Sequence, residues 1–201
     1  MTITLESPVE EKVVESNIET SFVETFKTEN LDFSKIIKTA EDKGWENALV
    51  TGGNLVKELR DSSIQYNKIS DFSDEHKNLL DFFANSLNIY LGLHPIANDF
   101  PTFSVSETFN ILKYEKGQAY HSTHADYFPY GLTNLRHLSG VCFMSDVSEG
   151  GELVFPQQDL EIKPERGKLV IFPSGWTHAH HTMPVLSDDL RYVFQLWWSF
   201  V

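Results

Sequence analysis

The chain has 201 residues, a formal net charge of −13 and a single cysteine, Cys142. This length fits one domain with a sizeable core. The acidic balance argues against nucleic acid and anionic membranes as partners, because both attract a surplus of Lys and Arg. One thiol excludes an internal disulfide and a Cys-rich zinc site, and it fits a cytoplasmic location. No apolar run approaches the ~18 residues that a membrane span needs.

Residues 1–20 form an acidic stretch that lacks the basic start and apolar core of a signal peptide, which indicates a flexible lead-in. We therefore expect one domain over residues 21–201. Residues 30–44 have apolar side chains at helical spacing and end at Gly44, which predicts a first helix. Residues 73–93 predict a second helix, with Ser73 as its N-cap. Its core-facing stripe is expected at every fourth residue, namely Leu79, Phe83, Leu87 and Leu91.

From about residue 100 the pattern changes to short, strand-like apolar runs with Gly and Pro between them. The runs span residues 104–114, 137–147, 151–155, 168–173 and 191–200. Short strands at such intervals are typical of a sandwich or barrel. The sequence thus predicts a mostly β domain, with its β core at about 100–201 and helices flanking it. Cys142 is expected to be buried and chemically quiet, on the strand face opposite Val141 and Phe143.

Two clusters of histidines lie in this β region. The first, within residues 117–130, contains His124 and Asp126. Residues i and i+2 of a strand share a face, so we expect this imidazole and carboxylate to lie side by side. Two His and one carboxylate on one face of an octahedron form the facial triad that binds non-haem Fe(II). The second cluster, residues 174–185, should supply the third ligand; alternation places His178 and His180 on one face and His181 on the other.

Several stretches together resemble the 2-oxoglutarate and iron(II)-dependent dioxygenases, specifically the prolyl 4-hydroxylase-like branch. They lie within residues 106–199 and read ILKYEKGQAY…HAD, EGGELVFP, KPERGKLVIFPSGWTHAH and HTMPV…RY…W. The resemblance implies a double-stranded β-helix, or jelly roll, with the helices on the outer face of one sheet. It also implies that His180, four residues before the Pro of Pro-Val, is the third iron ligand beside His124 and Asp126. His178 would then be a pocket-wall or hydrogen-bonded residue, and His181 would face solvent.

The same resemblance implies 2-oxoglutarate as the co-substrate, whose distal carboxylate needs a cationic partner. A guanidinium pairs with a carboxylate through two parallel hydrogen bonds, and Arg191 is the candidate. Trp197 lies six residues later and shares the strand face of Arg191. The family has a pocket-lining Tyr ten residues before the first ligand, which is Tyr114 here, with Tyr120 as its rival.

One position departs from the family pattern. Phe143 stands where many relatives carry a Tyr, whose hydroxyl often joins the Arg in holding the distal carboxylate. Either Tyr114, Ser139 or Thr182 compensates, or 2-oxoglutarate binds more weakly.

The resemblance implies an Fe(II)- and 2-oxoglutarate-dependent hydroxylase that uses dioxygen and releases succinate and carbon dioxide. Ascorbate is a candidate auxiliary reductant. Arg60 and Ser62 match the Arg-x-Ser stretch of prolyl 4-hydroxylases, which favours a Pro in a protein or peptide as the substrate. Two alternatives stay open, a hydroxylase of a free amino acid or other small molecule and a jelly-roll metal-binding protein without turnover. An open peptide groove would favour the first reading, and a closed pocket would favour a small substrate.

Overall fold

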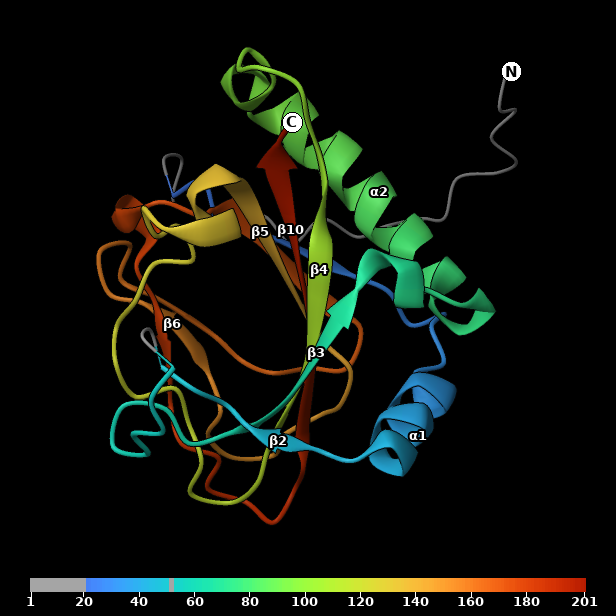
Figure 1. The fold of residues 1–201 in the computed structure, drawn as a ribbon, viewed down its shortest axis with the longest axis vertical. Coiled ribbons are helices and arrows are strands. Elements are labelled where there is room, and N and C mark those ends of the chain that lie inside the picture. The colour runs from blue at the N-terminus through green and yellow to red at the C-terminus, as the bar shows by residue number, and fades with distance from the viewer. Residues whose placement is uncertain (1–20, 51–52) are drawn as a thin grey trace.

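A computed structural model describes residues 21–50 and 53–201. The expected lead-in, residues 1–20, lies outside the described residues. Two antiparallel sheets face each other, and two α-helices lie on the far side of the larger sheet (Figure 1). The fold is the expected double-stranded β-helix with flanking helices.

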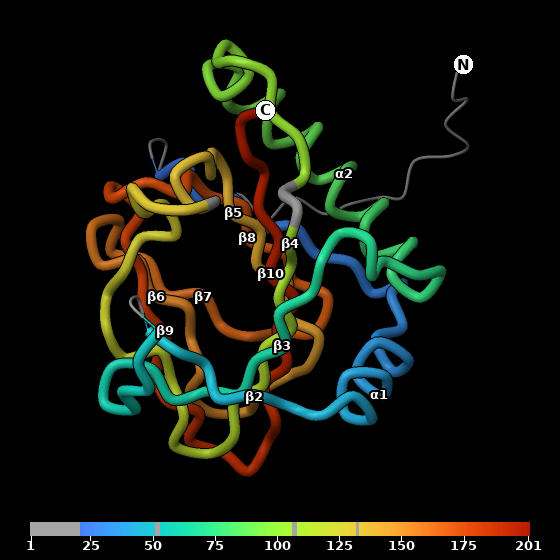
Figure 2. Tube along the Cα trace, viewed as in Figure 1, coloured from blue at the N-terminus to red at the C-terminus, as the bar shows by residue number. Residues whose placement is uncertain are grey.

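The large sheet has seven strands in the order β1-β8-β5-β10-β4-β3-β2. Its bounds are β1 Glu24–Lys27, β2 Glu46–Asn47, β3 Ser63–Lys68, β4 Phe103–Tyr114, β5 Arg136–Phe143, β8 Lys168–Pro173 and β10 Arg191–Phe200. The small sheet has the order β7-β6-β9. Its bounds are β6 Leu153–Phe155, β7 Leu160–Ile162 and β9 His181–Thr182. Figure 2 shows the small sheet opposite the strands β10, β4 and β3 of the large sheet.

The predicted strands agree with the structure to different degrees. The runs 168–173 and 191–200 match β8 and β10 to the residue. The run 137–147 continues too far, since β5 ends at Phe143, and β6 begins only at Leu153. Between them Gly150 and Gly151 take positive φ angles of 78° and 74°, a backbone conformation that favours glycine.

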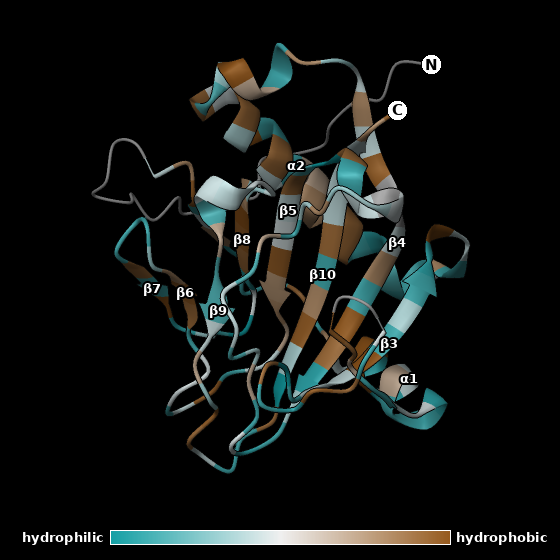
Figure 3. Ribbon diagram, turned by 60° about the vertical axis from the view of Figure 1, so that its left-hand side comes forward, coloured by the Kyte–Doolittle hydropathy of each residue, from teal (hydrophilic) through white to brown (hydrophobic). Residues whose placement is uncertain are grey.

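The first half of the chain is not purely helical, and this corrects the expected division into helices and then strands. β1 pairs with β8 at one edge of the large sheet, and β3 pairs with β4 toward the other edge. In Figure 3 the strands β8, β5, β10, β4 and β3 lie side by side, with α2 behind them. The core of the β domain therefore draws on strands that precede residue 100.

Both helices form as predicted, with shifted starts. α1 spans Ser34–Lys43, and the N–H of Gly44, at a φ of 84°, donates to the carbonyl of Ala40. α2 spans Lys77–Leu93. Ser73 therefore does not cap α2 directly; it precedes a 3₁₀ turn, Asp74–His76, that leads into the helix.

The buried face of α2 differs from the predicted stripe. Its first two members are buried, but Leu87 and Leu91 are only partly so, while Ser86 and Tyr90 are buried. A straight row of every fourth residue drifts around a helix of 3.6 residues per turn, so the contact line shifts to the i+7 and i+11 positions. No described helix has both the length and the apolar character that crossing a membrane requires.

The alternation along β10 separates two environments. Its outward side chains join a core beneath the helices, and they are Tyr192, Phe194, Leu196 and Trp198. Its inward side chains line a cavity between the sheets, and they are Arg191, Val193, Gln195 and Trp197. Cys142 is fully buried in the outer core, whereas Val141 and Phe143 belong to the inner one, as predicted. Burial raises the pKa of the Cys142 thiol.

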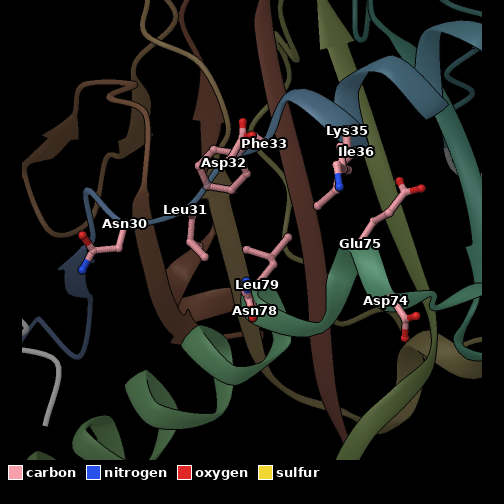
Figure 4. A pocket seen from close by; sticks show the side chains of 10 residues that line it. All are labelled: Asn30, Leu31, Asp32, Phe33, Lys35, Ile36, Asp74, Glu75, Asn78 and Leu79. Carbon is pink, nitrogen blue, oxygen red and sulfur yellow. The ribbon is translucent and has the colours of Figure 1, made fainter. Parts of the chain in front are cut away.

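A smaller hollow of about 210 Å³ lies outside the β core, where the segment before α1 meets the start of α2 (Figure 4). Its walls combine apolar side chains with Lys35 and the carboxylates of Asp32, Asp74 and Glu75. It contains no His or Cys, and it is separate from the cavity between the sheets.

Candidate active site

A cavity of about 880 Å³ opens between the two sheets. Its floor comes from the inner face of β4, β5 and β10, and its far wall comes from the two His-containing stretches and β6. Exposed aromatic side chains surround its mouth. The seven candidate metal and co-substrate residues lie far apart in the chain and all line this cavity, namely Tyr114, Tyr120, His124, Asp126, His180, Arg191 and Trp197.

His124, Asp126 and His180 meet at one point of the cavity wall. Their ligand atoms all lie within 4.8 Å of one another. Nε2 of His124 is 3.9 Å from Oδ1 of Asp126, and Nε2 of His180 is 4.0 Å from the same oxygen. Two imidazole nitrogens and a carboxylate oxygen at this spacing can hold one transition-metal ion on a single face.

A backbone bridge draws the two His stretches together. The N–H of His124 donates to the carbonyl of His180 at 2.9 Å, and the N–H of His180 donates back at 2.8 Å. This isolated bridge corrects the expectation of a regular strand at His124 and Asp126, although both side chains still reach the same point.

The tautomers and charges of the trio suit a metal ion. Nδ1–H of His124 donates to the carbonyl of Ser122 at 3.2 Å, and Nδ1–H of His180 donates to the carbonyl of His178 at 3.0 Å. Each Nε2 therefore keeps its lone pair directed at Asp126. Burial lowers the pKa of His124 to about 3, with His180 adding to the effect, so this imidazole is neutral.

Asp126 is held as a carboxylate. Burial alone would raise its pKa, but His180, His124 and Arg136 together hold the pKa below its ordinary value. Nε1–H of Trp197 donates to Oδ2 of Asp126 at 3.0 Å, which leaves Oδ1 facing the two imidazoles. The trio thus offers two imidazole nitrogens and one carboxylate oxygen, the set that a divalent first-row ion prefers.

The remaining histidines of the second cluster point elsewhere. His178 belongs to a 3₁₀ turn, Trp176–His178, so strand alternation does not apply and it does not share a face with His180. Its Nε2 hydrogen-bonds the carbonyl of Ser21 at 2.8 Å, while His181 lies 3.3 Å from the hydroxyl of Thr123. Neither belongs to the metal-binding cluster of the described residues.

Arg191 is a buried cation that Glu152 stabilises from a distance and that no carboxylate of the described residues contacts. Its exposure is 2%, and its Nε and Nη1 have no hydrogen-bond partner in the described part of the chain. The ring centroids of Tyr114 and Phe143 lie 4.6 Å and 5.2 Å from its Cζ. Burial lowers the pKa of Arg191, because the charged form is poorly solvated there. An anion entering the cavity would supply the missing partner.

Tyr120 has a different place from Tyr114. Its ring stacks on His124 with centroids 3.7 Å apart and an interplanar angle of 14°. The Cζ atom of Arg60 lies 4.7 Å from the same Tyr120 ring centroid. Tyr120 thus adjoins the metal trio, whereas Tyr114 adjoins Arg191. Oγ1 of Thr182 accepts the backbone N–H of Tyr120 at 2.8 Å, and Ser139 contacts Ser174 at 2.8 Å.

The sequence did not single out two amides of the cavity floor, Asn110 and Gln195. Alternation could have found both, because Gln195 lies between Arg191 and Trp197 on the same face and Asn110 precedes Tyr114 by four. Arg136, a second candidate from the sequence for holding the carboxylate, instead stacks against Trp197, whose ring centroid lies 3.5 Å from its Cζ.

The comparisons with known proteins point in one direction. Residues 109–199 match the model of the 2OG-Fe(II) oxygenase superfamily. Prolyl 4-hydroxylase 13 of Arabidopsis thaliana is 33% identical over 117 residues, which are 45% of this chain and 42% of that protein. The chain therefore spans less than half the length of this relative.

Two solved structures share the fold. One is a viral collagen prolyl hydroxylase from Paramecium Bursaria Chlorella virus-1, with a TM-score of 0.66, 17% identity, and coverage of 92% of this chain and 100% of that chain. The other is a prolyl hydroxylase from Trichoplax adhaerens, with a TM-score of 0.68, 15% identity, and coverage of 90% and 84%. At these identities the likeness supports the double-stranded β-helix alone. Residues 109–199, which hold the trio and Arg191, thus match the 2OG-Fe(II) oxygenase superfamily, and the chain is similar to prolyl 4-hydroxylases.

Proposed function

We propose that this chain is an Fe(II)- and 2-oxoglutarate-dependent hydroxylase that acts on a Pro in a protein or peptide. One observation carries the proposal. A His-Asp-His trio lines the same cavity as a buried arginine whose Nε and Nη1 have no partner among the described residues. The trio fits Fe(II), and the arginine fits the distal carboxylate of a dicarboxylate that reaches toward the metal.

The trio would hold the metal through Nε2 of His124, Oδ1 of Asp126 and Nε2 of His180. Three ligands on one face leave positions open toward the cavity. Bound Fe(II) and 2-oxoglutarate together supply the oxidising chemistry, in which dioxygen is consumed and succinate and carbon dioxide are released. Ascorbate would serve as the auxiliary reductant. The carboxylate of Asp126 occupies the position that a halide would need, which supports hydroxylation.

Arg191 would bind the distal carboxylate of 2-oxoglutarate. The rings of Tyr114 and Phe143 flank the guanidinium and keep water from it. In such an apolar setting a charge-assisted pair is stronger than in water. Phe143 brings no hydroxyl, so binding of the carboxylate depends on Arg191 with support from Tyr114. Burial lowers the pKa of Arg191, and the hydrogen bond with Tyr114 partly offsets this by raising it.

The mouth of the cavity suits an extended peptide better than a free amino acid. Four aromatic side chains line it and are exposed by 41–74%, namely Tyr66, Tyr127, Phe128 and Trp176. Aromatic grooves are the usual surfaces for Pro-rich segments. The relative from Trichoplax adhaerens was solved with a peptide fragment, and the viral one with 2-oxoglutarate, which supports both ligands here.

Succinate release tests this proposal. The purified chain is supplied with Fe(II), 2-oxoglutarate and ascorbate, and with two peptides that differ only by Pro or Ala at one position. We expect succinate above the peptide-free rate with the Pro peptide alone, and one added oxygen atom on that Pro by mass spectrometry. Asp126→Ala serves as the inactive control. Turnover with free amino acids and none with any Pro peptide would instead support the small-molecule alternative.

A further inference from the structure

Two carboxamide side chains face each other on the floor of the cavity. Asn110 on β4 and Gln195 on β10 are cross-strand partners, and both line the cavity. Inner-face neighbours on the same and adjoining strands are apolar, including Leu112, Val193 and Val141. The two amides therefore form a polar pair within an otherwise apolar stretch of the inner face.

Neither amide has a side-chain hydrogen bond in the part of the chain that the structure describes. Within residues 21–50 and 53–201 no side-chain hydrogen bond involves Asn110 or Gln195. Asn110 is 9% exposed and Gln195 is partly exposed, so both amides remain accessible from the cavity. A carboxamide that faces a cavity without a protein partner has its donors and its acceptor available for a ligand there.

The chemistry of the pair selects a neutral ligand. A carboxamide carries both donors and an acceptor and no charge, so it matches a peptide group better than a carboxylate. A cation that can pair with a carboxylate is already present at Arg191, on the same face of β10 and four residues before Gln195. A Pro residue has no N–H, so the peptide group before it offers only a carbonyl and needs a donor from the protein.

The row in which the pair lies leads to the surface. Register places Tyr66 of β3 beside Asn110 of β4, and Asn110 beside Gln195 of β10. Tyr66 is 52% exposed at the cavity mouth, Asn110 is buried, and Gln195 lies between the strand positions of Arg191 and Trp197. The row thus runs from an exposed ring inward across the floor of the cavity that the metal trio also lines.

We propose that Asn110 and Gln195 form a carboxamide clamp that donates hydrogen bonds to main-chain carbonyls of the substrate next to the target Pro. The clamp rests on the proposed hydroxylase function. Asn110 and Gln195 then determine which peptides bind. They are separate from the groups that bind the metal and the co-substrate.

Two substitutions of similar side-chain shape, Asn110→Leu and Gln195→Met, remove the amides and suit the apolar surroundings. The probe is fluorescein-labelled poly(L-proline), whose equilibrium binding to the full chain is followed by fluorescence anisotropy without turnover. Loss of one hydrogen bond should weaken binding on the order of 10-fold for each variant. The exposed Gln157→Met, outside the cavity, is the matched control and should bind as the unmodified chain does.

The same variants are then assayed for succinate release with a Pro peptide. The clamp predicts a raised KM for the peptide and an unchanged KM for 2-oxoglutarate. Unchanged peptide binding and KM in both variants, or a rise confined to the KM for 2-oxoglutarate, would overturn the clamp while leaving the hydroxylase intact. If the unmodified chain binds no poly(L-proline) and hydroxylates no Pro peptide, the proposed function fails, and the clamp fails with it.

Discussion

The indole Nε1–H of Trp197 donates to Oδ2 of Asp126 at 3.0 Å. One carboxylate oxygen is therefore fixed by the last strand of the large sheet, and the other faces the two imidazoles. Arg136 reinforces the arrangement, because its guanidinium stacks on Trp197 and its Nη1 donates to the carbonyl of Asp126 at 3.1 Å. The orientation of the carboxylate thus depends on contacts distant in the chain.

Removing this hydrogen bond should weaken metal binding. Trp197→Phe keeps an aromatic ring but loses the N–H donor, so Asp126 can rotate away from the two imidazoles. Loss of a partner of this kind typically costs ~10–100-fold in metal affinity. Titration of the metal-free protein with Co(II), followed by its visible absorption, measures the effect. Trp198→Phe on the opposite strand face is the control, and an equal loss in both variants would contradict the orienting role of Trp197.

The choice between the histidines of the second cluster can be tested in the same way. His180→Ala should abolish tight metal binding, because the trio loses a ligand. His178→Ala should retain it, since the ring of His178 hydrogen-bonds Ser21 and lies outside the trio. The metal content of each variant after dialysis, by mass spectrometry, gives the answer. Retention in His180→Ala together with loss in His178→Ala would reverse the assignment.

The affinity for the co-substrate 2-oxoglutarate should depend on Arg191. Arg191→Ala leaves a desolvated carboxylate unpaired, at a cost on the order of 2–5 kcal/mol, or ~30-fold to several thousand-fold in affinity. Arg191→Lys should lower the affinity less, because the ammonium group keeps the positive charge but cannot form two parallel hydrogen bonds to the carboxylate. Phe143→Tyr should tighten binding by adding a hydroxyl beside the guanidinium. Isothermal titration of the Mn(II)-loaded protein with 2-oxoglutarate tests all three, and unchanged affinity in Arg191→Ala would place the carboxylate elsewhere.

Close contact between α2 and the large sheet requires glycine at position 140. A Cβ there would lie 2.8 Å from Cε1 of Phe83 and 3.1 Å from Cζ3 of Trp198. Gly140→Ala should therefore destabilise the protein by ~1–3 kcal/mol, or several degrees in Tm at ~2–4 °C per kcal/mol. Gly92→Ala is the control, because nothing lies within 4 Å of its added Cβ and Ala favours the helix. Thermal unfolding followed by circular dichroism should show a lower Tm for the first variant only.

Local patterns in the sequence predicted much of the large sheet and of the site. Period-two alternation placed Arg191 and Trp197 on one face of the last strand, and Cys142 on the opposite face from Phe143. These features depend only on the strand period and on a sharp contrast between the two faces. The resemblance then separated His180 from its neighbours, which alternation could not do.

Other features depend on contacts that no local pattern records. Glu24–Lys27 is a short polar segment that becomes a strand only because β8 offers an unpaired edge. His178 escapes strand alternation because a 3₁₀ turn reverses the chain just before His180. The pairing of Asn110 with Gln195 requires the register between β4 and β10, which depends on the whole sheet.

One cavity should bind Fe(II) through the trio and 2-oxoglutarate through Arg191 at the same time. Anaerobic titration with both ligands is the decisive measurement, since a chelated pair gives a weak metal-to-ligand charge-transfer absorption in the visible region. We expect this band for the unmodified chain, its absence in Asp126→Ala, and its appearance only at higher 2-oxoglutarate in Arg191→Ala. A band that persists unchanged in both variants, or none in the unmodified chain at saturating ligands, would contradict this expectation.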